Sequence, residues 1–260
     1  MKDIVIQGIN WDAKSSFQQG PAKAPDLIRK ALYSDSMNLY TELGVSIEND
    51  AITDKGDFTI NEYFDIETIT KNNIDAGSKL LSLGGDHSVT FPIIKAFNEY
   101  YPKLDILHID AHADLYHEYE GDPYSHACPF ARIMENGFAV KLVQIGIRTL
   151  NPHQADQAKK YDVDVHEMRN LDLNAIPKFN NPLYISLDMD GFDPAFAPGV
   201  SHHEPGGLSS RQVLDLIHSI DTEVVGADIV EYNPDRDFHD MTAYLAAKMM
   251  KELLGKLMGN

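Results

Sequence analysis

The chain has 260 residues, of which 43% are hydrophobic and 24% charged, and its formal net charge is −18. These values fit a globular protein with a sizeable core, and we expect one domain over residues 1–260. The acidic balance argues against nucleic acid or an anionic membrane as partner, and it would attract a small cation. The single cysteine, no apolar run near the ~18 residues of a membrane span and no secretory leader together predict a cytoplasmic protein.

Short apolar runs alternate with helical patterns along the whole chain. The predicted strands are residues 4–9, 79–85, 104–110, 141–147, 163–168, 182–188 and 224–230. Helical patterns are clearest over residues 89–101, 209–220 and 242–258, and Ser209 or Ser210 is the expected N-cap of the second. This alternation predicts an α/β fold with a mainly parallel sheet covered by helices on both faces. The polar and acidic residues 48–75 show no clear pattern.

Charged residues gather just past four of the predicted strands. They are His87 in "GGDHS", Asp110, His112 and Asp114 in "DAHAD", Asp188 and Asp190 in "SLDMD", and Glu231 in "VEYNP". Ligands of open α/β sheets bind beyond the carboxyl ends of the strands. Alternate residues of an extended segment also point to one face, so these side chains can converge on one edge of the sheet.

The first six of these residues form a plausible ligand set for metal ions. Two imidazoles and four carboxylates can hold two divalent cations, and the ions would offset the repulsion between the carboxylates. Such a set suits Mn²⁺, with Zn²⁺ or Fe²⁺ as alternatives. An isolated Asp after a strand usually caps a turn or a helix, but capping does not need two carboxylate clusters plus imidazole.

Five other polar residues near these clusters are predicted to be structural. His108 lies inside a predicted strand and reads as a satisfied core histidine. Asp193 precedes a proline and would order its loop, and Asp86 would bond to backbone groups. We expect Cys128 to be a small buried residue and Arg148 to be structural.

The clusters resemble the ureohydrolase family, which contains arginase and agmatinase, and among its members the chain looks most like bacterial agmatinase. The matching segments are "GGDHS", "DAHAD", "SLDMDGFDPAFAPG", "PGGLS" and "GADIVEYNP", with "GPAKAPDLIRKAL" near the start. The resemblance implies a three-layer αβα fold, two Mn²⁺ per chain, and hydrolysis of a guanidinium to urea and an amine. It also implies a homo-oligomer, a trimer or a hexamer. The implied metal ligands are His87, Asp110, His112, Asp114, Asp188 and Asp190.

The same resemblance implies three catalytic residues. Glu231 would hold the guanidinium of the substrate, and His126 in "YSHACPF" would shuttle protons beside it. Asp114 would accept a proton from the attacking water and deliver it to the leaving amine.

The loop between the "DAHAD" segment and His126 bears on the substrate. It carries Glu118, Glu120 and Asp122 and no Asn, so it would repel a substrate carboxylate and accept an ammonium group. This favours agmatine, which would yield putrescine, over arginine. The loop "PGVSHHEPGG" departs from the family pattern, and its two histidines, at positions 202 and 203, would face the pocket mouth.

Other functions remain open from the sequence. Guanidine, guanidinobutyrate or arginine are alternative substrates. A metal-dependent amide deacetylase would need one zinc with an open position, which the six-ligand set does not favour. A catalytically silent regulatory member of the family would be expected to lack a ligand, His126 or Glu231, and all of them are present.

Overall fold

One parallel sheet runs through residues 3–75 and 77–259, the part of the chain that this computed structural model describes. Its strands lie in the order β2-β1-β3-β8-β7-β4-β5-β6, and each neighbouring pair is parallel. The strands are β1 (Ile4–Asn10), β2 (Ile52–Thr59), β3 (Lys79–Leu83), β4 (Asp105–Ile109), β5 (Lys141–Ile147), β6 (Asp164–Glu167), β7 (Leu183–Asp188) and β8 (Val224–Val230).

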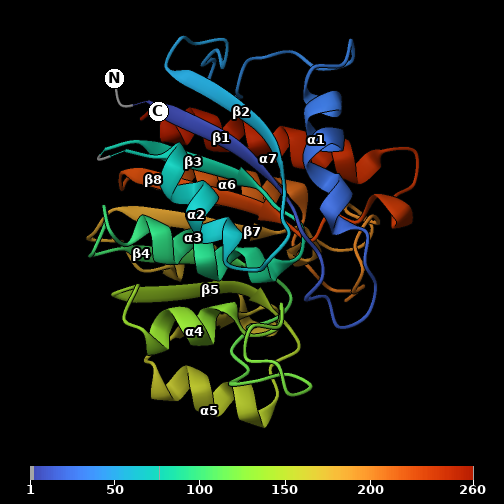
Figure 1. Cartoon of the computed structure of the whole chain (residues 1–260). Coiled ribbons are helices and arrows are strands. Elements are labelled where there is room, and N and C mark those ends of the chain that lie inside the picture. Colours follow the sequence, from blue (N-terminus) through green and yellow to red (C-terminus); the bar gives the residue numbers. More distant parts are fainter. Residues whose placement is uncertain (1–2, 76, 260) are drawn as a thin grey trace.

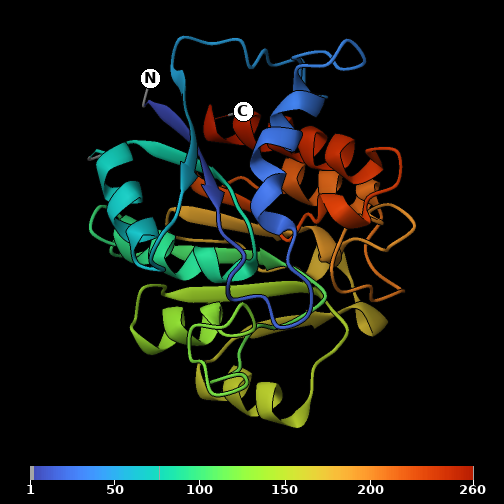
Figure 2. The same cartoon turned by 45° about the vertical axis from the view of Figure 1, so that its right-hand side comes forward.

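Helices cover both faces of this sheet. They are α1 (Ala24–Leu32), α2 (Asp65–Asn73), α3 (Thr90–Phe97), α4 (Pro129–Glu135), α5 (Pro152–Lys160), α6 (Ser210–Ser219) and α7 (Met241–Leu257). Alternate residues of a strand point to opposite faces of the sheet and pack in two separate hydrophobic cores. Ile4 and Ile6 pack in the core with α1, α6 and α7, whereas Val5 packs in the core with α2, α3 and α4. Figures 1 and 2 show the sheet between these two helical layers. The predicted three-layer αβα fold with a parallel sheet is therefore confirmed.

All seven predicted strands are present, with ends that differ by at most two residues. The N-cap of α6 is Ser209, whose side chain accepts from the backbone N–H of Gln212. The unclear region 48–75 contains the eighth strand, β2, and helix α2. Strand β2 escaped prediction because it is an edge strand with mostly exposed polar residues, one of which, Asp54, pairs with Arg29 on α1 at 2.7 Å.

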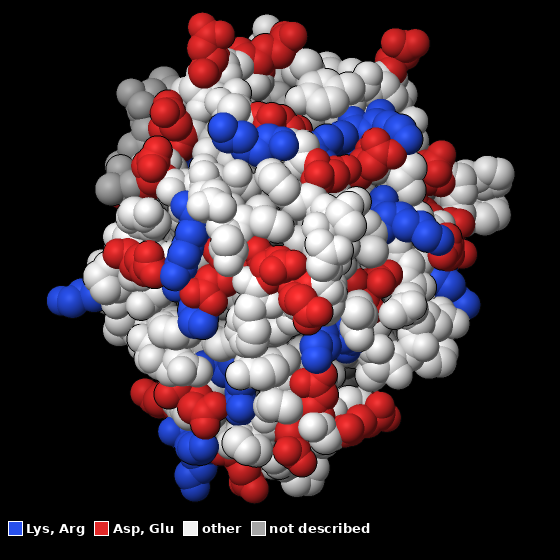
Figure 3. All heavy atoms as spheres, in the orientation of Figure 1, with Lys and Arg blue, Asp and Glu red and all other residues white. Residues whose placement is uncertain are grey.

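The surface carries charges of both signs. Figure 3 shows Lys and Arg side chains dispersed among Asp and Glu on one face of the molecule. None of the helices in the described residues is long and apolar enough to cross a membrane.

Candidate metal centre and active site

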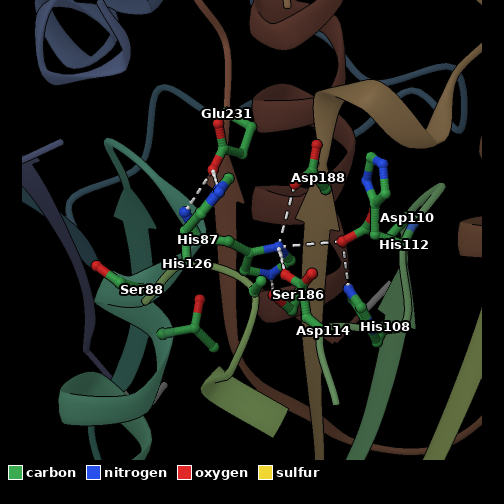
Figure 4. Close-up of polar contacts among 12 residues, drawn as sticks. His87, Ser88, His108, Asp110, His112, Asp114, His126, Ser186, Asp188 and Glu231 are labelled. Carbon is green, nitrogen blue, oxygen red and sulfur yellow. Dashed lines mark hydrogen bonds and ion pairs between the residues drawn. The ribbon is translucent and has the colours of Figure 1, made fainter. Parts of the chain in front are cut away.

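The charged residues that the sequence singled out lie past the carboxyl ends of four adjacent strands. Strands β3, β8, β7 and β4 are neighbours in the sheet, although they are far apart in the chain. A turn after β3 carries His87, β7 ends at Asp188, and Glu231 follows β8 directly. The segment after β4 carries Asp110 and Asp114. Figure 4 shows these side chains pointing toward one another.

His87 lies at the centre of the cluster. Its Nδ1 faces three carboxylate oxygens at 3.1–3.2 Å, those of Asp110, Asp114 and Asp188. Its Nε2 lies 3.0 Å from Ser186 Oγ, which donates its own hydrogen to Asp228 at 2.7 Å. Nε2 must therefore carry a hydrogen and donate to Ser186, so that in the neutral ring the lone pair lies on Nδ1. This buried Nδ1 has no hydrogen-bond partner among the described residues, and a cation between it and the carboxylates would satisfy all of them.

A second imidazole faces the other side of Asp110. His112 Nδ1 lies 3.1 Å from Asp190 Oδ2 and 3.4 Å from Asp110 Oδ1. Asp110 therefore presents one oxygen toward His87 and the other toward His112. The geometry gives two neighbouring groups of donor atoms that share one carboxylate, and it brings together all six of the predicted ligands.

The charge balance of this cluster calls for positive charge. Burial and the neighbouring carboxylates raise the pKa of Asp188 well above its ordinary value, and they raise that of Asp190 to about 6. Burial opposes protonation of His87 and His112, but the surrounding carboxylates outweigh it and raise the pKa of both imidazoles well above the usual range. Without an ion the cluster holds protons, and divalent cations would take their place. Carboxylate and imidazole donors together fit a divalent transition-metal ion.

His108 is a core histidine, as predicted, with both ring nitrogens bonded. It is fully buried, and its ring stacks on Phe130 with the centroids 3.8 Å apart. The amide of Gln144 donates to Nδ1 at 3.0 Å, so Nε2 carries the hydrogen and donates to Asp110 at 2.8 Å. His108 therefore has no lone pair left for a metal, and it holds Asp110 in place, which the sequence did not reveal.

Glu231 and His126 form the second part of the site. Glu231 Oε1 accepts the backbone N–H of His87 at 2.9 Å and lies 2.9 Å from His126 Nδ1. Burial would raise the pKa of Glu231, but these donors outweigh it and lower that pKa, so the side chain is a carboxylate. Its Oε2 has no donor among the described residues and is available to a guanidinium.

Two of these acidic residues have unusual backbone conformations. Asp114 has φ 49° and Glu231 has φ 61°, in the left-handed region that residues with a side chain rarely occupy. Such conformations cost about 1–3 kcal/mol each and cluster at functional sites. The backbone N–H of Glu231 donates to Gly85 O at 2.8 Å, which ties this strained residue to the turn that carries His87.

A pocket opens above the cluster. Its walls include His112, Asp114, Asp188, Asp190, His126 and Glu231, all from the predicted set. The sequence did not point to the other polar residues that line it, because they have no local pattern and only the fold brings them to the site; all stand in loops except Gln154, which lies in α5. They are Ser16, Tyr116, Tyr119, Thr149, Gln154 and Glu204.

His202 reaches the pocket mouth as predicted, and His203 does not. The ring of His202 packs 5.4 Å from that of His126 and 5.7 Å from that of His112, measured between centroids. His203 is exposed and bonds to Pro198 O at 2.7 Å. Only the first of the two histidines can therefore affect the size of the pocket.

The expectation that the loop after the "DAHAD" segment makes the pocket acidic is wrong. Glu118 and Glu120 are exposed and are not among the described residues that line the pocket. Asp122 is paired with Lys14 Nζ at 2.5 Å. The loop instead contributes the rings of two tyrosines, at positions 116 and 119, to the pocket wall.

The other residues predicted to be structural behave as expected. Asp193 accepts backbone N–H groups of its own loop, including that of Gly206 at 2.7 Å. Arg148 donates to several carbonyls, including that of Asp190 at 2.7 Å. Cys128 is buried, and burial together with nearby Asp114 raises the pKa of its thiol to about 12, so it is not a nucleophile at neutral pH.

Comparison with known proteins gives a consistent set of relatives. Arginase from Medicago truncatula is 45% identical over 97% of this chain and 81% of its own length. An N(1)-aminopropylagmatine ureohydrolase from Thermus thermophilus is 36% identical over 92% of this chain and 86% of its own. Both alignments cover nearly the whole chain, so they relate entire folds.

Solved structures agree with these sequence relatives. Arginase from Medicago truncatula superposes with a TM-score of 0.92 at 41% identity, over 98% of this chain and 87% of the other. A putative agmatinase from Clostridium difficile superposes with a TM-score of 0.88 at 27% identity, over 98% and 97%. A model of the arginase family matches residues 2–255. With these matches and a site built from the expected side chains, the chain belongs to the arginase family.

Proposed function

We propose that this protein hydrolyses a guanidino compound to urea and an amine, with two Mn²⁺ held by the six-ligand cluster. That cluster is His87, Asp110, His112, Asp114, Asp188 and Asp190. The observation that carries the proposal is the buried His87 Nδ1, which has no hydrogen-bond partner among the described residues and faces three carboxylate oxygens at 3.1–3.2 Å. When bound, the ions would supply a water of lowered pKa as nucleophile.

The chain's own residues would bind the substrate and move protons. Glu231 would hold the planar guanidinium through Oε2 by charge-assisted hydrogen bonds, which orients its carbon over the cluster. Asp114 lines the same pocket and would pass a proton to the leaving nitrogen. His126, bonded to Glu231 at 2.9 Å, would exchange protons with solvent.

For the substrate tail, the pocket supports agmatine, which would yield putrescine. Glu204 lies in the pocket wall, and the described lining residues include no Lys or Arg that could pair with a carboxylate. Thr149 donates its hydroxyl hydrogen to Ala111 O at 3.2 Å, so this hydroxyl is not a free donor. A tail that ends in an ammonium group suits these surroundings better than an α-amino acid does.

Arginine is the second candidate, because proteins named arginase are among the most similar relatives. They match 97% of the chain at up to 45% identity. The ureohydrolase from Thermus thermophilus, at 36% identity, is instead named for an agmatine that carries a further aminopropyl group. Sequence similarity therefore supports both kinds of tail, and the two substrates must be compared directly.

A urea-release panel tests the proposal. The protein, supplied with Mn²⁺, is assayed with agmatine, arginine, guanidinobutyrate and guanidine. We expect urea from agmatine with the highest kcat/KM. Equal turnover of agmatine and arginine would refute the preference for agmatine, and absence of urea from all four compounds would refute the reaction.

A further inference from the structure

A loop that the sequence did not associate with the site crosses over it. Residues 11–19, between β1 and α1, lie against the loop that carries His126, as the dark blue segment after β1 does in Figure 2. The backbone N–H of Lys14 donates to Asp86 Oδ2 at 2.9 Å, and its carbonyl accepts the backbone N–H of His126 at 3.3 Å. Asp86 thus bonds to the backbone, as predicted, and it anchors this loop beside His87.

The close approach depends on a glycine. A Cβ at position 85 would lie 1.5 Å from Trp11 O, so only glycine lets the end of β3 pass this loop. The backbone N–H of Asp86 donates to the same Trp11 carbonyl at 3.0 Å. These contacts fix the loop at its start, a few residues before the segment that reaches the pocket.

Ser16 is the residue of this loop that contacts His126. Its hydroxyl lies 2.8 Å from His126 Nε2, and its backbone N–H donates to the same nitrogen at 3.2 Å. His126 is only 8% exposed, whereas Ser16 is exposed to solvent and also lines the pocket. The hydroxyl of Ser16 therefore lies between a buried imidazole and water.

The directions of the hydrogen bonds define the state of His126. A backbone N–H can only donate, so Nε2 must offer a lone pair, and the ring hydrogen lies on Nδ1, facing Glu231. Burial lowers the pKa of His126, but Glu231 and nearby Asp86 and Asp114 raise it, to about 9 on balance. The N–H of Ser16 favours the neutral ring and the surrounding carboxylates favour the protonated one, so the two sets of contacts oppose each other. His202, whose ring packs against that of His126, is the other titratable group facing it.

We propose that Ser16 is the positioning residue that connects His126 to solvent and relays its protons, an inference that rests on the proposed function. In one direction, the hydroxyl hydrogen of Ser16 passes to Nε2 while Oγ takes a hydrogen from a solvent acid. The Nδ1 hydrogen of His126 then passes to the neutral amine product in the pocket, which becomes an ammonium. The overall reaction balances, because a guanidinium and one water give urea and an ammonium, and both water hydrogens end on the leaving nitrogen. The reverse hops return the ring to its starting tautomer.

The chain offers a matched control for this inference. Ser15, the adjacent residue, carries the same hydroxyl, but that hydroxyl contacts Asp86 at 3.3 Å and not His126. Ser16→Ala removes the hydroxyl and keeps the backbone N–H that positions the ring. Ser16→Thr keeps both groups.

The experiment measures kcat and KM of the Mn²⁺-loaded wild type and of the three variants, at low and high concentrations of imidazole buffer. A positioned general acid or base typically contributes about 100- to 10,000-fold to a rate. Ser16 acts one step behind such a group, so we expect Ser16→Ala to lose about 10- to 100-fold in kcat with little change in KM. Imidazole should restore part of this loss by carrying protons directly to His126. Ser16→Thr and Ser15→Ala should remain within about threefold of the wild type. Unchanged kcat in Ser16→Ala, or a loss that imidazole does not reduce, would overturn the relay.

A second readout separates this inference from the proposed function. The ¹⁵N chemical shifts of the His126 ring in the metal-free protein report which nitrogen carries hydrogen and whether Nε2 accepts a hydrogen bond. We expect Ser16→Ala to shift the Nε2 resonance and Ser15→Ala to leave it unchanged. An unchanged Nε2 resonance in Ser16→Ala would refute the contact itself. If the wild type releases no urea from any guanidino compound while the resonance responds as expected, the proposed reaction fails and the Ser16–His126 contact stands.

Discussion

The six-ligand cluster and the pocket rim are built in different ways. We define the pocket rim as Ser16, Tyr116, Tyr119, His202 and Glu204, which line the pocket away from the cluster. The cluster stands at or just past the ends of three buried strands, β3, β4 and β7, and four of its members are under 4% exposed. The rim stands on three loops that meet only in the folded chain. The reaction type should therefore depend on the rigid sheet edge, and the choice of substrate on the loops.

The two regions also differ in electrostatics. The cluster is over-supplied with buried negative charge, which raises the pKa of Asp188 and of both imidazoles. The negative charge of such a site would be balanced by bound cations. The rim contains a single carboxylate, that of Glu204, which is partly exposed. Changes in the cluster should accordingly have large effects, and changes in the rim small and substrate-dependent ones.

The largest effect is expected from Asp110→Asn. This residue faces both imidazoles, so loss of its charge would remove a carboxylate common to both proposed metal positions. Activity should fall about a thousandfold or more, beyond the 10- to 100-fold typical of outer-shell partners. Metal analysis should show fewer than two Mn²⁺ per chain. Asp193→Asn, which alters a loop carboxylate that bonds to backbone N–H groups, serves as control and should keep its metal. A variant at position 110 with full metal content and more than a tenth of the activity would contradict the shared-ligand role.

Glu231→Gln should have the next largest effect. The amide oxygen can still accept the N–H of His87, so the fold and metal content should remain. The charge proposed to hold the guanidinium is lost, and kcat/KM should fall about 100- to 1,000-fold, comparable to removal of a donor that stabilises a transition state. Kinetics and metal analysis on the same sample test this. Loss of metal in the variant would show that Glu231 serves the ions instead of the substrate.

His108→Phe tests whether the cluster depends on residues behind it. The substitution preserves the stack on Phe130 and removes the donor to Asp110. Mn²⁺ affinity, measured by competition with a chelating dye, should fall about 10- to 100-fold. His153→Phe changes a histidine outside the cluster and should leave the affinity unchanged. Equal affinities in the two variants would mean that His108 only fills space.

The contrast between the regions explains what could be predicted from the sequence. The strand ends carry their charged residues in a local pattern, from which the six proposed ligands and Glu231 were predicted. His126 was predicted only from the family resemblance, and the fold brings all of these side chains together. Strand β2 was missed because its polar residues lack an apolar pattern at a sheet edge. Ser16 and Glu204 were missed because loop residues acquire neighbours only through the fold. The single domain over residues 1–260, the trimeric or hexameric assembly and the cytoplasmic location stay predictions.

The acidic loop shows the limit of reading substrate choice from composition. Glu118, Glu120 and Asp122 suggested a negative pocket, but two of them point to solvent and the third is neutralised by Lys14. The sequence gives the number of charged side chains in a loop, but not the directions in which they point. The carboxylate that would favour a cationic tail is instead that of Glu204, from a different loop.

Acidification should weaken metal binding. In the metal-free protein the pKa of His87, His112 and Asp188 is raised, so below those values the groups hold protons that the ions must displace. Mn²⁺ affinity should therefore rise with pH. For each displaced proton, it should fall about tenfold with every unit by which the pH is lowered. Calorimetry in buffers of different ionisation enthalpy measures the protons released. Binding heats that are independent of the buffer would show that the cluster is already deprotonated.

The smallest effect is expected at the rim, from Glu204→Gln. Loss of a partly exposed charge that faces an ammonium group should raise KM for agmatine about three- to tenfold, as about 1 kcal/mol of a solvent-screened ion pair implies. Pentylguanidine has the same length and ends in a methyl group in place of the ammonium group, so its KM should not change. Glu120→Gln removes an equal charge outside the pocket and should affect neither substrate. If Glu204→Gln raises the KM of both compounds equally, the pocket rim does not interact with the charge of the tail. The preference for agmatine over arginine must then come from the shape of the pocket around Tyr116 and His202.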